Sequence, residues 1–437
     1  MKRTVICFSA CAAFAVLAAS ITLSADVLSL TADGGGSSPS LSDLERTASV
    51  YHSYEFNPIA DTPAPEGFVP FYIAHYGRHG SRRLTDAFVA DALEPLDAAE
   101  KRGGLTVEGT TLLADIRKIA AVHDGMAGQL TERGADEHRM LARRMAARFP
   151  GVFAGERRIH CQSSIYPRVL ISQANFTTVL KDAAPLVSFD FITGDKFLNL
   201  LNGPQFSRDD VNADARIRES VNAHAASAIN PLPIVKRFFA QDFAPGEPLK
   251  FVRDLFVVAS ICQCCSTELA GLDIYRYFTL PEIEAISRIL EAEHYAVMAN
   301  SAEFGDIQLR GSRNLARDFA IRAEEAIADG SIAADLRFGH DSGLWPFVGL
   351  LGLEGPGDRV PFAESWQKCP AWKWMPMAAN LQMVFYRDKS GEVLVKVLYN
   401  EQEAKVRGLV PFAGPYYRWQ DLREHVSRTI ERIGDLK

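Results

Sequence analysis

The sequence lacks an excess of positive charge and contains no internal repeat. Its 437 residues include 47 Lys and Arg against 54 Asp and Glu, which gives a formal net charge of −7. Without a global excess of cations the chain displaces few counterions from a nucleic acid backbone, so we expect no nucleic acid partner. Because 47% of the residues are hydrophobic and 23% are charged, the composition also excludes a disordered polyanion.

Long apolar runs are absent after the first 25 residues. Lys2 and Arg3 precede an apolar run over residues 5–23 that ends in small residues. This order is typical of a secretory signal peptide, so we expect residues 1–25 to be cleaved rather than kept as a membrane anchor. Cleavage would lower the net charge from −7 to −9. The sequence therefore predicts an exported protein, periplasmic or secreted, without a membrane partner after cleavage.

Cysteines are few, and two of the seven lie in the predicted signal peptide. The mature chain keeps an odd number, namely Cys161, Cys262, Cys264, Cys265 and Cys369. Export permits disulfides, and we expect structural cysteines with one or two disulfides whose pairing the sequence does not give. The spacing within 262–265 does not match the usual pairs of zinc ligands, so we predict no metal site.

Apolar runs at 68–75, 336–339 and 393–399 are typical of buried strands. Helical spacing of apolar residues occurs over 131–149 and after Thr279, which forms a capping-box pattern with its third neighbour. Strands that alternate with helices predict an α/β fold with a mostly parallel central sheet flanked by helices.

The pattern also predicts the division of the chain. Residues 26–50 are expected to form a flexible tether, because the stretch 31–42 is rich in Gly and Ser. We expect 51–190 and 331–437 to build the α/β domain. The mainly helical segment 191–330 would then be an inserted α-helical cap.

A histidine between two arginines directly follows the first predicted strand, in the sequence YGRHGSR. Ligands bind beyond the carboxyl ends of the strands in open α/β sheets, so this turn is well placed for a site. Arg78 and Arg82 can each hydrogen-bond phosphate oxygens, and neutral His79 is a competent nucleophile. Alternatively, such a short motif is a surface turn with satisfied charges.

Two further segments argue against a simple surface turn. In LRFGHDSG, His340 follows a second predicted strand and could bind the same phosphate, while Asp341 could donate a proton to the leaving oxygen. A carboxyl group that faces an anionic substrate has a raised pKa, as this role requires. In SSIYPR, Arg168 adds a third arginine ahead of a predicted helix over 170–179.

These motifs resemble the histidine acid phosphatase branch of the histidine phosphatase superfamily. The chain is more closely similar to multiple inositol polyphosphate phosphatases and bacterial phytases. This closer resemblance rests on HYGRHGSR, GQLTERGADEHRMLARRMAARFPGVF, SSIYPRVLISQANF, LRFGHDSGLWPFVGLLGL, VLYNEQEAKV and GPYYRW. The middle of the chain, about 190–330, matches weakly.

The resemblance implies that His79 forms a phosphohistidine and that Asp341 is the proton donor. It assigns phosphate binding to four residues, Arg78, Arg82, Arg168 and His340. It implies no cofactor and no metal, because arginines and histidines supply the positive charge. Animal inositol polyphosphate phosphatases have His-Ala-Glu where this chain has His340-Asp341-Ser342, so the acid resembles that of the other phytases and acid phosphatases.

The implied function is hydrolysis of phosphomonoesters in inositol polyphosphates such as phytate, a small phosphorylated substrate. A broad-specificity acid phosphatase for sugar phosphates or nucleotides is an alternative. The number of basic groups beyond the first phosphate distinguishes the two, and Arg310 and Arg313 in the predicted cap are either such groups or surface charges. A secreted polyanion-binding protein without catalysis is a third possibility, which the intact His79 and Asp341 argue against.

Overall fold

The structure, a computed structural model, describes residues 41–85, 87–203, 208–240 and 243–434. All of them belong to one compact unit, Ser37–Lys437. The predicted signal peptide and residues 26–40 of the predicted tether lie outside the described residues. Within the described ranges, no helix combines the length and the hydropathy that a membrane crossing requires.

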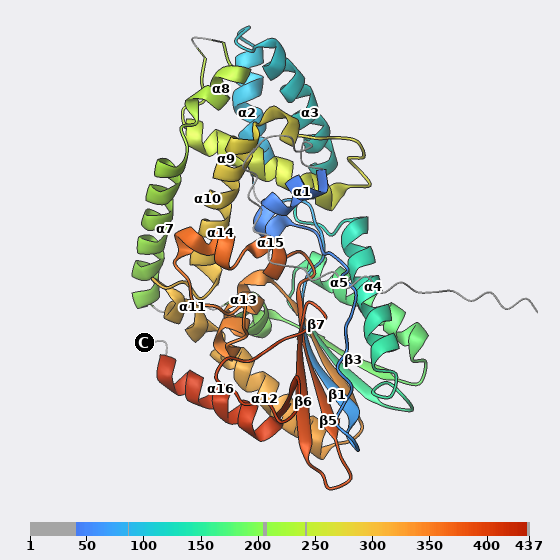
Figure 1. The fold of residues 1–437 in the computed structure, drawn as a ribbon. Coiled ribbons are helices and arrows are strands. Elements are labelled where there is room, and N and C mark those ends of the chain that lie inside the picture. Colours follow the sequence, from blue (N-terminus) through green and yellow to red (C-terminus); the bar gives the residue numbers. More distant parts are fainter. Residues whose placement is uncertain (1–40, 86, 204–207, 241–242, 435–437) are drawn as a thin grey trace, which may run out of the picture. The chain divides into compact units, whose positions relative to one another are not determined.

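The described residues form a mixed eight-stranded sheet (Figure 1) in the order β3-β2-β4-β1-β5-β6-β7, with β8 paired to β6. The strands are β1 (Val69–Arg78), β2 (Arg158–Ser163), β3 (Ser188–Thr193), β4 (Ile332–Gly339), β5 (Asn380–Arg387), β6 (Val393–Tyr399), β7 (Gln402–Glu403) and β8 (Tyr416–Arg418). β3, β2, β4 and β1 are parallel, whereas β5 to β8 pair antiparallel with their neighbours. β5 and β6 pair antiparallel because a short turn joins them. The predicted α/β fold class is confirmed.

Helices cover both faces of the sheet, with α4 and α5 on one side and α12 and α16 on the other (Figure 1). The bounds of these helices are α4 (Glu132–Arg148), α5 (Pro167–Ala183), α12 (Arg313–Ala328) and α16 (Trp419–Ile433). A further helix, α13 (Asp341–Leu351), packs against β1, α12 and α16. Along β1, Ile73 packs in the core on the α4 side, and Tyr72 and Tyr76 pack in the core on the other. A strand buried on both faces reads as a continuous apolar run, which explains the pattern of the sequence over 68–75.

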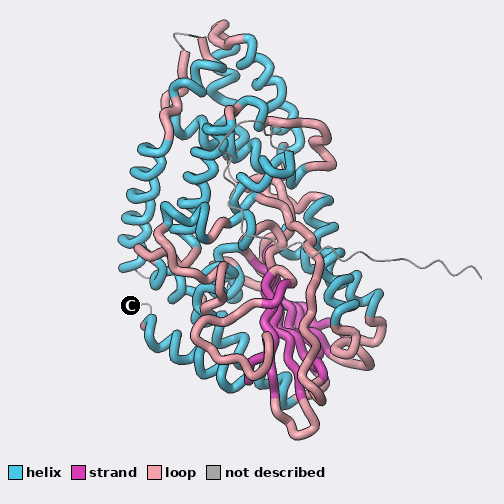
Figure 2. Tube along the Cα trace, in the orientation of Figure 1, coloured by secondary structure: helices cyan, strands magenta, loops and turns pink. Residues whose placement is uncertain are grey.

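A second group of helices gathers away from the strands (Figure 2). It contains α2 (Phe88–Glu100), α3 (Val107–His123), α7 (Arg208–Ala228), α8 (Leu232–Phe238), α9 (Pro248–Ile261) and α10 (Leu280–Met298). α2 packs against α9 and α3 against α8, so residues before 191 join helices of the predicted cap. α12, by contrast, packs on β1 and β4. The domain boundaries stay a prediction.

Short helical segments complete the described chain. They are α1 (Leu41–Glu45), η1 (Arg46–Tyr51), η2 (Asp195–Phe197), α6 (Leu198–Leu201), η3 (Cys262–Cys265), η4 (Tyr275–Tyr277), α11 (Gly305–Gly311), η5 (Phe362–Glu364), α14 (Ser365–Lys368) and α15 (Ala371–Trp374).

Residues 41–50, predicted to be part of the tether, are folded. α1 leads into the 3-10 helix η1, and every residue from Thr47 to Tyr51 is buried. η1 packs against α9, α10 and α15. The prediction was wrong here because η1 is too short to show the apolar periodicity of a helix. Its position depends on hydrogen bonds to main-chain carbonyls, such as those of Thr47, Val50 and Tyr51, which any residue type can accept.

The five described cysteines are free thiols, so the one or two expected disulfides do not form among them. Cys262 and Cys264 instead donate hydrogen bonds to the main-chain carbonyls of Val258 and Tyr51. Burial raises the pKa of Cys262 to about 12, which keeps this thiol protonated.

Candidate active site

The predicted site residues meet at the carboxyl ends of neighbouring parallel strands. Arg78 at the end of β1 pairs in register with Gly339 at the end of β4. The next residues of the two strands, His79 and His340, therefore lie side by side, and their ring centroids are 5.4 Å apart in an edge-to-face contact. Arg168 joins them from the first turn of α5, which follows the adjacent strand β2.

His79 is buried, and hydrogen bonds of the main chain orient it. Its backbone N–H donates to the carbonyl of Gly339 at 3.0 Å, and its Nδ1 lies 3.0 Å from the carbonyl oxygen of Gly80. A carbonyl only accepts, so Nδ1 carries the proton and Nε2 keeps the lone pair. Burial, followed by the charges of Arg78 and Arg82, holds the pKa of His79 well below its usual value. The ring is therefore neutral and nucleophilic in mildly acidic solution.

The loop after His79 is held by α4 and α5. The backbone N–H of Gly80 donates to Ser172 Oγ at 3.2 Å, and the buried Glu137 carboxylate accepts from the backbone N–H and the hydroxyl of Ser81, each at 2.7 Å. A Cβ on Gly80 would lie 2.4 Å from the carbonyl oxygen of Gly134, so this close approach requires glycine. Sequence reasoning missed Glu137, whose only signal is an acidic residue among the apolar positions of a predicted helix.

Arg78 is completely buried, and main-chain carbonyls fix its guanidinium plane. Nη1 donates to the carbonyls of Val50 and Met375, both at 2.7 Å. Nη2 lies 2.6 Å from Asp341 Oδ2 in an ion pair. Two segments far apart in the sequence thus set the position of this arginine beside the nucleophile.

Three guanidinium groups present buried donors at the site. Nε of Arg78, Arg82 and Arg168 is in each case buried and has no hydrogen-bond acceptor among the described residues. Burial, followed by the charge of Arg82, lowers the pKa of Arg168 to about 10, and all three charges act on His79. Buried donors without acceptors cost free energy, and the oxygens of a phosphoryl group are suited to accept from all three.

His340 occupies the N-cap position of α13, and a serine of the β2–α5 loop contacts its ring. Its Nε2 lies 2.9 Å from Ser164 Oγ, and the Tyr166 ring packs edge to face against it with centroids 5.2 Å apart. Burial, followed by the charge of Arg168, lowers the pKa of His340 to about 3, so this ring is also neutral. Ser164 and Tyr166 were missed by sequence reasoning, although SSIYPR contains both.

Asp341 is the first residue of α13, and its pKa is lowered. Burial by itself would raise this pKa, but the positive charges of Arg78 and Arg82 outweigh burial. The raised pKa expected from the sequence assumed a carboxyl group that faces an anion, whereas here the carboxylate faces Arg78. A phosphate dianion that shares Arg78 would offset these charges and raise the pKa again.

Arg310 and Arg313 do not contribute to this site. Arg310 Nε donates to the carbonyl of Ile433 at 2.9 Å, and Arg313 donates to the carbonyl of Gly434. Both arginines therefore bind the carboxyl end of α16, where the helix dipole favours positive charge. The option that they reach a second substrate phosphate is not supported.

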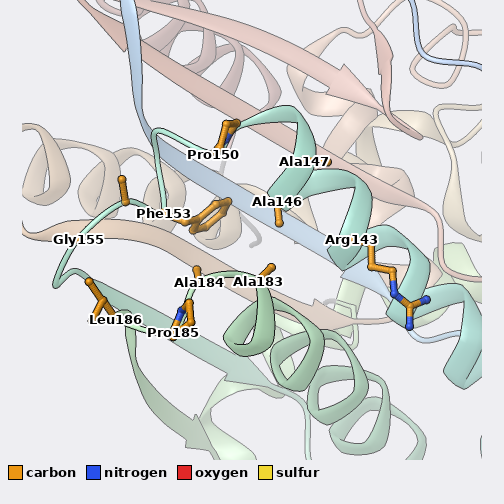
Figure 3. A pocket seen from close by; sticks show the side chains of 11 residues that line it. Arg143, Ala146, Ala147, Pro150, Phe153, Gly155, Ala183, Ala184, Pro185 and Leu186 are labelled. Carbon is orange, nitrogen blue, oxygen red and sulfur yellow. The ribbon is translucent and has the colours of Figure 1, made fainter. Parts of the chain in front are cut away.

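An apolar groove of about 520 Å³ lies elsewhere, between the carboxyl ends of α4 and α5 (Figure 3). It is lined mostly by small apolar side chains, with Phe153 at its wall and Arg143 at its rim. The residues of α4 and α5 that hold the histidine loop lie nearer the amino ends of the same helices, so this groove is separate from the predicted site.

Replacing Ser164 with alanine is expected to lower kcat/KM for phosphate release about tenfold, mainly through KM, because His340 loses the contact that orients its ring. The neighbouring Ser163 provides the control, since its buried hydroxyl has no hydrogen-bond partner in the described structure. Ser163→Ala should leave kcat/KM unchanged. Equal losses in both variants would show that Ser164 does not orient His340.

A buried neutral histidine, surrounded by arginines at the strand ends of a helix-flanked sheet, is the arrangement that the sequence predicted for a histidine-type phosphatase. Comparison with known proteins confirms the predicted resemblance to the histidine acid phosphatase branch. No model of a protein family matches the sequence.

More particularly, the chain is similar to multiple inositol polyphosphate phosphatases. It is 26% identical over 407 residues to multiple inositol polyphosphate phosphatase 1 of Gallus gallus, covering 85% of this chain and 82% of the relative. Among solved structures, it matches the multiple inositol polyphosphate phosphatase of Bifidobacterium longum in complex with phosphate, with a TM-score of 0.75 and 21% identity over 88% of this chain and 98% of that one. The phytase of D. castellii matches with a TM-score of 0.64 and 14% identity, over 90% and 88% of the two chains.

Proposed function

We propose that this protein is a phosphomonoester hydrolase that removes phosphate from inositol polyphosphates through a phosphohistidine on His79. One observation carries the proposal: three arginines with buried Nε donors that lack acceptors among the described residues act on a neutral histidine whose Nε2 keeps its lone pair. A transferring phosphoryl group needs a nucleophile and donors for its oxygens, and this site supplies both.

In the first step, Nε2 of His79 attacks phosphorus, and the bond from phosphorus to the leaving oxygen breaks. Arg78, Arg82 and Arg168 stabilise the charge on the phosphoryl oxygens during transfer. Asp341, protonated when the dianion is bound, gives its proton to the leaving alkoxide so that an alcohol departs.

In the second step, water attacks the phosphorus of phosphohistidine, and the carboxylate of Asp341 accepts the proton of that water. The bond from phosphorus to nitrogen breaks, inorganic phosphate leaves, and His79 returns to its neutral form. The two steps together consume one water for each ester hydrolysed.

We favour inositol polyphosphates as the substrate class because the relatives of this chain are named multiple inositol polyphosphate phosphatases. The B. longum phosphatase has also been solved in complex with inositol hexasulfate, and this chain matches that structure with a TM-score of 0.73. Arg310 and Arg313 do not supply cations for further phosphates. Sugar phosphates and nucleotides are therefore the substrates against which the preference should be measured.

The test is phosphate release from phytate, glucose 1-phosphate and a nucleoside monophosphate at equal concentration. We expect the highest kcat/KM with phytate. Comparable values for all three would favour a broad-specificity acid phosphatase. No release from any of them, by a protein that unfolds cooperatively and binds phytate, would favour a binding protein without catalysis.

We also propose that the protein is exported, on the basis of the cationic start and apolar run of residues 1–25. Expression of the full chain in a bacterial host, followed by fractionation and mass determination of the N-terminal peptide, tests this. An uncleaved N-terminus in the cytoplasmic fraction would contradict it.

A further inference from the structure

Ser49 in η1 has a backbone conformation that serine rarely adopts. Its φ is 54° and its ψ is −130°, and the residue is completely buried. Positive φ favours glycine, because a Cβ crowds the backbone there, so a serine held in this region is strained. Strain of this kind persists only where the surrounding structure imposes it.

The side chain of Ser49 is held by α10. Its hydroxyl lies 3.1 Å from His294 Nδ1. A residue of α10 therefore contacts a serine whose backbone is strained.

The conformation of Ser49 sets the direction of the carbonyl that follows. The Ser49 carbonyl accepts from the backbone N–H of His52 at 3.1 Å, which closes a turn, and the Val50 carbonyl accepts from Arg78 Nη1 at 2.7 Å. Arg78 has one other main-chain acceptor, Met375, and its Nη2 meets Asp341. The turn at Ser49 thus provides half of the main-chain support of the arginine between nucleophile and acid.

The chain after this turn continues along the nucleophile loop. Ser53 Oγ lies 3.1 Å from Ser81 Oγ, and the backbone N–H of Tyr54 donates to Glu137, which also holds Ser81. On the other side, Ser53 N donates to Gln263 of η3 at 2.9 Å. Residues 49–54 therefore lie between the helical segments η3 and α10 and the loop that carries His79.

We propose that Ser49 is a positioning residue: its strained turn, anchored by His294, directs the Val50 carbonyl at Arg78 and so fixes this arginine for phosphate binding. The inference rests on the proposed function only where it is tested by kcat/KM. The affinity for inorganic phosphate, measured by calorimetry, tests the position of Arg78 without requiring turnover.

Two variants separate the backbone from the hydroxyl. Ser49→Ala and Ser49→Gly both lose the contacts with α10, but only glycine adopts the positive φ without cost. We expect kcat/KM to fall about tenfold in Ser49→Ala and to stay within about threefold of wild type in Ser49→Gly. The inhibition constant for inorganic phosphate should rise in parallel in Ser49→Ala alone.

Ser365→Ala is the matched control, since Ser365 is also completely buried but lies at the start of α14 with φ −58° and ψ −37°. It should leave kcat/KM and the inhibition constant unchanged. Equal kinetics and equal phosphate inhibition in Ser49→Ala and Ser49→Gly would overturn the inference. If wild type proves inactive, calorimetric titration with inorganic phosphate decides: weaker binding in Ser49→Ala than in Ser49→Gly supports the positioning role, and equal binding refutes it.

Discussion

Replacing His79 with alanine is expected to lower phosphate release from phytate by a factor of about 10⁴ or more. The variant lacks the nitrogen that attacks phosphorus in the proposed mechanism, while the arginines proposed to bind the phosphate remain. Inorganic phosphate should still bind, because Arg78, Arg82, Arg168 and His340 are intact. Loss of turnover together with retained binding, measured by calorimetry, separates the nucleophile from the binding groups.

The covalent intermediate gives a second measurement. Wild type mixed with labelled substrate and quenched in alkali should retain label as phosphohistidine, which alkali preserves and acid cleaves, and His79→Ala should retain none. His160→Ala is a suitable control, because this histidine lies earlier on β2 and pairs with Asp190 at the protein surface. Release by His79→Ala at the rate of His160→Ala would exclude a phosphohistidine on His79.

The residues around His79 could be predicted because their placement is local. A buried strand that ends in polar residues and glycine places those side chains at the sheet edge, and this logic applied equally to His79 and to His340. The register of β1 against β4 then brings the two histidines together. Arg168 was predicted from a different signal, its place ahead of a helix, and the structure shows that it also follows a strand that neighbours β4.

The groups that orient these residues could not be predicted, because they come from distant parts of the chain. Arg78 depends on carbonyls of Val50 and Met375, and any residue type offers a carbonyl, so neither left a signal in the sequence. Ser49 gave none either, since a serine with positive φ looks like any serine in a polar stretch. The prediction of a flexible tether failed for residues 41–50 because the contacts that fold them come from distant parts of the chain.

Replacing Asp341 with asparagine is the second change with a large expected effect. The amide keeps the shape of the carboxyl group and a hydrogen-bond acceptor for Arg78, but it cannot donate a proton at the strength of a carboxylic acid. Phosphate release from phytate should therefore fall about 10²–10⁴-fold, the range typical of general acid–base catalysis. Asp335→Asn serves as the control, because this buried carboxylate accepts from Tyr72 within the sheet and does not face the site.

The pH dependence follows from the protonation state that each group needs. His79 must be neutral, and its pKa lies well below the usual value, so it remains competent as pH falls. Asp341 must be protonated to act as an acid, and its pKa in the free protein is lowered, so kcat/KM should decrease as pH rises through that pKa. This alkaline decrease should disappear in Asp341→Asn, because the group that titrates is gone.

The leaving group distinguishes the two roles of Asp341. p-Nitrophenolate departs without a proton, so Asp341→Asn should transfer the phosphoryl group from p-nitrophenyl phosphate to His79 at nearly the wild-type rate. Hydrolysis of phosphohistidine still needs a base, so this variant should release a burst of about one nitrophenol per enzyme and then slow down. An equal loss of the first turnover with phytate and with p-nitrophenyl phosphate would mean that Asp341 orients Arg78 rather than donating the proton.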